Sequence, residues 1–130
     1  MVEATERGEE LLSLTEDVVK KAREAGAESA EAFAIRNATT GIQIERDSVK
    51  FTSSTVSSGV AVRIIKEGRM GFSYTNRLDD LERMIEEAII SSRFFPPKRM
   101  SFSSGGHFLP ESTFYDDKVF SLEVEDGFEM

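Results

Sequence analysis

The sequence predicts an α+β fold of two layers, in which two helices cover one face of a mainly antiparallel sheet of about five strands. Two helical stripes of apolar residues flank a central region where apolar and polar residues alternate, so the expected order is α-β-β-β-β-β-α. The expected turns are too short to hold crossover helices, which makes neighbouring strands antiparallel. We expect this domain to cover residues 1–94, and a connector with the start of a truncated further segment to cover 95–130.

The first helix is expected over about residues 6–25. Its acidic residues lie near the start and its basic residues near the end, which suits the helix dipole. Gly26 is the expected C-terminal cap, because glycine reaches the left-handed conformation without a Cβ penalty. The apolar stripe consists of Leu11, Leu14, Val18, Ala22 and Ala25.

Short alternating runs predict the strands. They lie at residues 30–35, at 42–45 and from Val49 into a Ser/Thr-rich stretch, TSSTVSS. Polar turn-forming residues predict breaks at Asn37–Gly41 and at Arg46–Ser48. These breaks divide the region into separate short strands.

The stretch SSGVAVRIIKEGRMGFSYTN, residues 57–76, offers a choice between a phosphate-binding loop and a β-hairpin. Its glycines match neither G-x-G-x-x-G nor the P-loop pattern. A phosphate loop joins a strand to a helix, whereas Gly68 lies between two alternating runs. The sequence therefore predicts a β-hairpin, and the glycines Gly59, Gly68 and Gly71 are expected only to turn the chain.

The second helix is expected to begin at Asn76 as the N-cap, with Asp79 three residues later in a variant of the capping box. Because the residue before a proline avoids the helical region, Pro96 places the end of the helix by about Phe94. The apolar stripe consists of Leu78, Leu81, Ile85, Ala88 and Ile89. The final SLEVEDGFEM is expected to start a further helix.

Composition excludes several classes of function. The formal net charge is −8, so the chain lacks the basic surface that nucleic-acid binding needs. The absence of cysteine excludes disulfides, thiolate metal sites and cysteine nucleophiles. The N-terminus has no secretory signal, and no apolar run approaches the roughly 20 residues that span a bilayer. We expect a cytoplasmic protein of one domain, or of one domain and a tail.

No residue is expected to be catalytic, cofactor-binding or metal-binding. His107 is the single histidine, and Pro110 separates it from Glu111, whereas a zinc site needs three or four ligands. The serines within 52–58 lack a G-x-S-x-G elbow. Adjacent carboxylates diverge and are expected to be solvated; these pairs are Asp79/Asp80, Asp116/Asp117 and Glu125/Asp126.

Aromatic residues are dense in the region without a repeat, where a flexible linker would have few. We expect this segment to pack against the domain or against a partner. The aromatic residues are Phe94, Phe95, Phe102, Phe108, Phe114, Tyr115 and Phe120.

Several segments resemble the N-terminal domain of the TldD/PmbA family of proposed zinc metalloproteases, also labelled modulators of DNA gyrase. The carrying pieces are GAESAE, TSSTVSSGVAVRII, EGRMGFSYTN and the helix that follows, up to Arg93. The tail PESTFYDDKVFSLEVEDGFEM also resembles the connector to the next helix of that family. The resemblance therefore covers nearly the whole chain but only the first third of a typical member.

The resemblance implies a cytoplasmic metalloprotease that acts on unfolded or small peptides. Family members pair as homodimers or heterodimers around a chamber, and the N-terminal domain helps to form its wall. The zinc motif HExxxH lies downstream in the family and does not occur here, so no catalytic or metal-binding role transfers to this chain. The chain itself is expected to hold no cofactor.

Two interpretations stay open. The first is a non-catalytic domain of such a protease, either in the catalytic TldD-like branch or in the partner PmbA-like branch, which TTGIQIERDSVKFTSST favours. The second is a stand-alone interaction module without enzymatic activity, which binds peptides or a protein through sheet edges and the aromatic tail.

Overall fold

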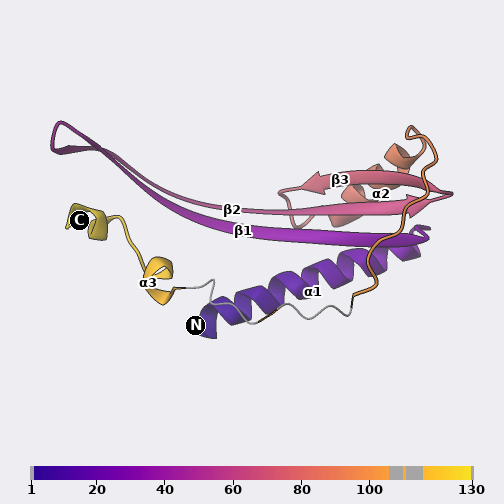
Figure 1. The fold of residues 1–130 in the computed structure, drawn as a ribbon, viewed down its shortest axis with the longest axis horizontal. Helices are drawn as coiled ribbons and strands as arrows, with labels where there is room; N and C mark the ends of the chain where they lie inside the picture. The colour runs from indigo at the N-terminus through magenta and orange to yellow at the C-terminus, as the bar shows by residue number, and fades with distance from the viewer. Residues whose placement is uncertain (1, 106–109, 111–115, 130) are drawn as a thin grey trace. The chain divides into compact units, whose positions relative to one another are not determined.

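The computed structural model describes residues 2–105, 110 and 116–129. Its contacts divide the chain into two units. The core unit holds residues 2–35 and 58–105, and the tip unit holds 36–57 with the described residues after 105. The elements are α1 (Val2–Glu24), β1 (Ser29–Glu45), β2 (Ser48–Lys66), β3 (Arg69–Thr75), α2 (Leu81–Ser92), α3 (Asp117–Phe120) and a 3₁₀ helix, η1 (Glu125–Phe128) (Figure 1).

The sheet has three strands in the order β1-β2-β3. The α+β class and the antiparallel pairing are confirmed, but the prediction of about five strands is wrong. The expected break at Asn37–Gly41 lies inside β1, which runs for 17 residues. The expected strands on either side of Gly59 likewise form one strand, β2, of 19 residues.

The conformation of the glycines explains the longer strands. Gly41 and Gly59 do not take the positive φ that a tight turn needs. Positive φ occurs instead at Arg46 and Asp47, and at Glu67 and Gly68, which form the two hairpin turns. Around Gly41 and Gly59, β-branched threonine and valine allow the extended backbone. Hydrogen bonding between the neighbouring strands β1 and β2 then keeps both strands continuous.

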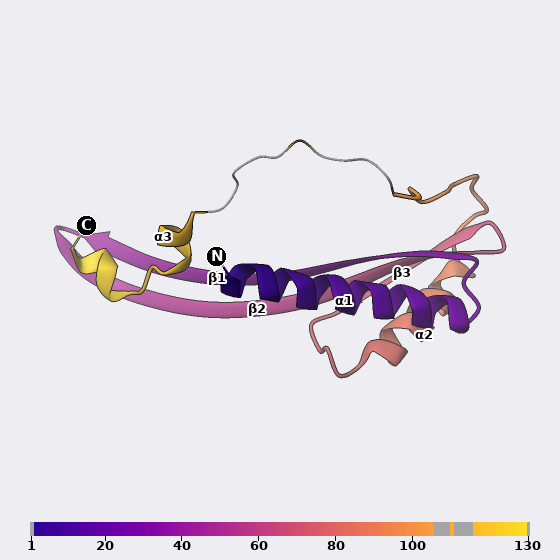
Figure 2. The ribbon, with the colours of Figure 1, turned by 90° about the horizontal axis from the view of Figure 1, so that it is seen from below.

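Both helices of the core unit cover the same face of the sheet. The buried cluster combines residues of α1, β2 and α2, which places the core between the sheet and the two helices (Figure 2). The alanines of β1 border this cluster. Its members are Val18, Ala22, Ala27, Val60, Val62, Ile64, Leu81, Met84, Ile85 and Ala88. The predicted two-layer arrangement is therefore confirmed for this unit.

α1 begins at Val2, earlier than predicted, and ends as predicted. Gly26 has a φ of +108°. Its N–H donates to the carbonyl of Arg23, and the N–H of Ala27 donates to that of Ala22, each at 3.0 Å. These two bonds are the Schellman pattern, and Ala27 is buried as the pattern requires.

α2 begins at Leu81, and its N-cap is Asp80, so the prediction of Asn76 as the N-cap is wrong. The hydroxyl of Thr75 accepts the N–H of Arg77 at 3.0 Å, which forms a local turn before the helix. This turn leaves Leu78 in the loop and 44% exposed, although the sequence pattern placed it in the core. Met84, which the predicted stripe omitted, is 1% exposed.

In the tip unit, the β1–β2 turn places Glu45 and Lys50 in an ion pair. Gly127 of η1 is buried and packs closely against Ile42. A Cβ on this glycine would lie 1.5 Å from Ile42 Cδ1, so only glycine fits there. The predicted helix in SLEVEDGFEM is wrong for the described residues, where a single 3₁₀ turn forms. Glycine within this segment disfavours a longer helix.

Candidate functional site at the β3–α2 junction

β3 lies at one edge of the sheet, so one side of its backbone has no neighbouring strand. Lys66 pairs with Arg69 across the two-residue turn, so these residues exchange both backbone hydrogen bonds. Hydrogen-bonded and non-hydrogen-bonded pairs then alternate along the strands. The backbone groups of Phe72 and Tyr74 therefore face the outer edge of the sheet.

Ser91 of α2 satisfies the edge at Phe72. The Phe72 N–H donates to Ser91 Oγ at 3.0 Å, and Ser91 Oγ donates to the Phe72 carbonyl at 3.1 Å. One hydroxyl group thus replaces the missing neighbouring strand at this position. A short polar side chain beside an edge strand blocks pairing with another chain there.

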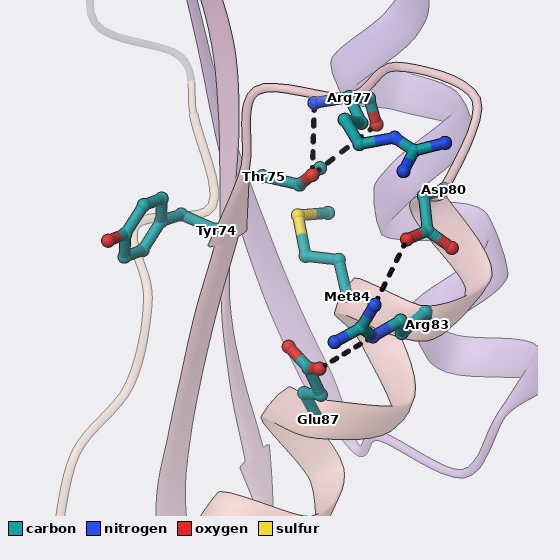
Figure 3. A pocket seen from close by; sticks show the side chains of 7 residues that line it. All are labelled: Tyr74, Thr75, Arg77, Asp80, Arg83, Met84 and Glu87. Atoms are coloured by element: carbon teal, nitrogen blue, oxygen red, sulfur yellow. Dashed lines mark hydrogen bonds and ion pairs between the residues drawn. The ribbon is translucent and has the colours of Figure 1, made fainter.

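Tyr74 has no such cover. Among the residues that the structure describes, no group bonds to its outward N–H and carbonyl. A groove of about 620 Å³ follows this edge from Phe72 to Asn76 and reaches Glu87. The Tyr74 side chain is 73% exposed and points away from α2 (Figure 3). This part of the edge can accept the main chain of another strand.

A smaller cleft of about 140 Å³ lies between the end of β3 and the start of α2. It is lined by Tyr74, Thr75, Arg77, Asp80, Arg83, Met84 and Glu87 (Figure 3). Arg83 Nε donates to Glu87 Oε1 at 2.9 Å, and Arg83 Nη1 lies 3.7 Å from Asp80 Oδ2. The other oxygen of Glu87 accepts the Ser73 hydroxyl at 3.1 Å. This network fixes α2 to β3.

Arg77 lies at the mouth of the cleft, and its Nη2 contacts Asp79 Oδ2 at 3.3 Å. This hydrogen bond raises the pKa of Arg77 and lowers the pKa of Asp79. Lys21 joins α1 to α2 in a similar way: its bonds to Glu82 and Asp17 raise the pKa of Lys21, and the bond from Lys21 lowers the pKa of Glu82. All these groups are exposed, so the pairs are screened by solvent.

The side chains that line the cleft are mostly polar. Arg83 pairs with Asp80 and Glu87, and Arg77 pairs with Asp79 beside the cleft. The aliphatic hydroxyl of the lining, on Thr75, bonds to the backbone of Arg77. Nucleophilic catalysis needs a nucleophile within reach of a free base, and the lining residues do not present that pair. The sequence pattern did not indicate this site, because it depends on which strand lies at the edge.

The residues weighed from the sequence fall in several places. Asp79 and Asp80 contact different arginines, as adjacent side chains do. Asp116 accepts the N–H of Lys118 at 2.8 Å as the N-cap of α3, and Asp126 accepts the N–H of Glu123 at 2.8 Å. Three of the expected residues or sets lie outside the described residues: His107, Glu111 and the aromatics Phe108, Phe114 and Tyr115.

The described residues do not fit a zinc site. In residues 2–105, 110 and 116–129, no three His, Asp or Glu side chains gather as metal ligands. In the same part of the chain, no helix is long and apolar enough to cross a membrane.

Comparison with known proteins identifies the fold. Residues 30–92 match the family model described as PmbA/TldA metallopeptidase domain 1. This stretch is an N-terminal TldD/PmbA-family domain. The match covers β1, β2, β3 and α2, so the edge strand, the groove and the cleft lie within the TldD/PmbA domain.

Solved structures agree with this assignment. TldE from Thermococcus kodakarensis has a TM-score of 0.75 at 15% identity, covering 86% of this chain and 26% of its own. A proposed modulator of DNA gyrase from Bacteroides thetaiotaomicron has a TM-score of 0.74 at 25% identity, covering 90% and 28%. A third, from Thermotoga maritima, has a TM-score of 0.74 at 19% identity, covering 90% and 26%.

The chain thus spans about a quarter of the length of these structures, with 26% to 28% of each covered. A search of the curated proteins finds no match for the sequence.

Proposed function

We propose that this chain is the non-catalytic N-terminal domain of a TldD/PmbA-like metalloprotease that acts on unfolded or small peptides. The match of residues 30–92 to the first domain of the family carries this proposal. The domain contributes to a chamber wall and to assembly with subunits of the TldD/PmbA type in the cytoplasm. HExxxH does not occur in the sequence, and the family resemblance implies that zinc is bound downstream of this domain.

The purified chain is expected to contain no stoichiometric zinc and to cleave no peptide, because it lacks the ligands that hold and activate the metal. Metal analysis and a peptidase assay with added zinc test this, with a zinc-loaded TldD-type subunit as the positive control. Zinc-dependent cleavage by this chain alone would contradict the proposal. Assembly is tested separately by co-purification with TldD/PmbA-type subunits, and failure to associate with any of them would argue against a role in subunit assembly.

The open edge at Tyr74 supports a second candidate function, a module that binds an extended peptide without enzymatic activity. The free N–H and carbonyl of Tyr74 match the groups that an added strand presents. The residues that line the groove include one carboxylate, on Glu87, which pairs with Arg83, and no lysine or arginine. A basic peptide therefore meets no like charge among the lining residues.

Tyr74→Pro tests this candidate, because proline removes the outward N–H while an edge strand tolerates its ring. With a fluorescein-labelled alternating lysine–valine peptide, we expect affinity to fall about three- to tenfold, the value of one hydrogen bond. Tyr74→Ala is the matched control, since it removes the same side chain and keeps the N–H. Equal binding by Tyr74→Pro and Tyr74→Ala, or no binding by the unsubstituted chain, would exclude strand addition at this edge.

A further inference from the structure

We infer that a pocket beside the β2–β3 turn binds a phosphate-type oxyanion, a property independent of the proposed function. The pocket has a volume of about 290 Å³ and lies in the core unit. Five residues line it: Lys66 and Arg69 on either side of the turn, Glu67 within the turn, and Ser92 and Arg93 at the end of α2. Three of the five carry a positive charge, in a chain whose formal net charge is −8.

These three cations have no carboxylate partner in the part of the chain that the structure describes. Among the described residues, Lys66, Arg69 and Arg93 form no ion pair, and Glu67 forms none either. The basic side chains that do pair with carboxylates elsewhere are Lys21, Lys50, Arg63, Arg77 and Arg83. Three of the cations that form no ion pair among the described residues therefore line one pocket, in a chain with a surplus of carboxylates.

The backbone holds the cations near one another. Lys66 and Arg69 are direct cross-strand partners, a position in which like charges destabilise the sheet. The Arg69 guanidinium donates to the carbonyl of Phe95, which holds it against the connector. Lys66 Nζ lies 3.2 Å from the position of a Cβ on Gly26, beside the C-terminal end of α1. A bound anion would offset the repulsion that this arrangement creates.

The charge and the donors of the pocket indicate its ligand. Three cations and one carboxylate leave a formal charge of +2 on the lining residues. A phosphate group carries about −1.5 to −2 near neutral pH and offers three strong acceptor oxygens. The planar forks of Arg69 and Arg93 suit bidentate bonds to such oxygens. A carboxylate carries a single charge and would leave part of the repulsion in place.

Titration of the ¹⁵N-labelled chain with inorganic phosphate tests the inference. We expect saturable shifts of the backbone signals of Gly68, Arg69 and Ser92, which are absent with chloride at the same ionic strength and weaker with acetate. O-phosphoserine serves as a second probe. Tighter binding of phosphoserine than of inorganic phosphate would identify a phosphoryl ester as the source of the anion, and the reverse order would identify free phosphate.

Arg69→Gln is expected to weaken phosphate binding at least about tenfold, the value of a charge-assisted bond. Arg63→Gln is the matched control, since Arg63 is an arginine of the core unit that is paired with Glu31 and lines neither the pocket nor the cleft, and it should leave binding unchanged. Lys66→Met provides a second variant if Arg69→Gln perturbs the spectrum of the fold. Equal shifts with chloride, or unchanged binding in both pocket variants, would overturn the inference. The cations would then interact only with the C-terminal ends of α1 and α2.

Discussion

Gly71→Ala is expected to destabilise the core unit by about 3 kcal/mol, the upper end of the usual cost of overpacking. At Gly71, the backbone of β3 packs directly against α2. A Cβ at this position would lie 1.9 Å from the carbonyl oxygen of Ala88 and 3.0 Å from the Cβ of Ser92. Because the nearest obstacle is helix backbone, the helix itself must shift to accept one methyl group.

Gly59→Ala is the matched control for this prediction. A Cβ on Gly59 would make ordinary contact, 3.7 Å from the Thr75 carbonyl oxygen, and its φ is not in the left-handed region. This substitution should be neutral or stabilise by up to about 1 kcal/mol through the unfolded chain. Urea unfolding followed by circular dichroism measures both variants, and equal midpoints would show that α2 yields at no cost.

Ile64→Ala is expected to lower the free energy of unfolding by about 2 to 5 kcal/mol, through lost burial and the cavity that remains. Ile64 lies on the central strand β2 and is fully buried in the cluster shared with both helices. Neighbouring strands and helices hold the site open, so it cannot collapse to fill the space. For a domain with a typical stability of about 5 to 15 kcal/mol, this is a large part of the total.

Ile90→Ala removes the same atoms from a side chain that is 51% exposed on α2. We expect a change within about 0.5 kcal/mol, because about half of this residue already contacts water and alanine favours the helix. Urea unfolding at fixed pH compares the two isoleucine variants. A similar loss at both positions would place Ile64 outside the structural core.

The oxyanion pocket shows why net charge is a poor guide to local sites. A formal charge of −8 argued against a basic surface, and for the chain as a whole it still does. Arg93 is 24 residues from Arg69 in the sequence, so no motif places it beside the β2–β3 turn. The glycine-containing stretch is not a phosphate loop, but the cations around its turn provide a different route to the same ligand class.

The edge of the sheet was likewise outside the reach of sequence patterns. Alternation along residues 70–74 predicts a strand but not whether another strand pairs with its outer side. Ser91 belongs to no sequence motif, and its position beside Phe72 shows that it bonds to the edge of the sheet. Tyr74 differs from Phe72 because no side chain among the described residues bonds to its outward backbone groups.

Local chemistry explains what the sequence determined by itself: the two main helices, the cap at Gly26, both hairpin turns and the family. A glycine with positive φ and a helical stripe are properties of a few consecutive residues, and so they can be read from the sequence. The tertiary structure alone decided that β1 and β2 stay continuous, that the edge at Tyr74 is open, and that Lys66, Arg69 and Arg93 share a pocket. Each of these depends on contacts between distant segments, whose packing overrides local turn preferences and brings charges together.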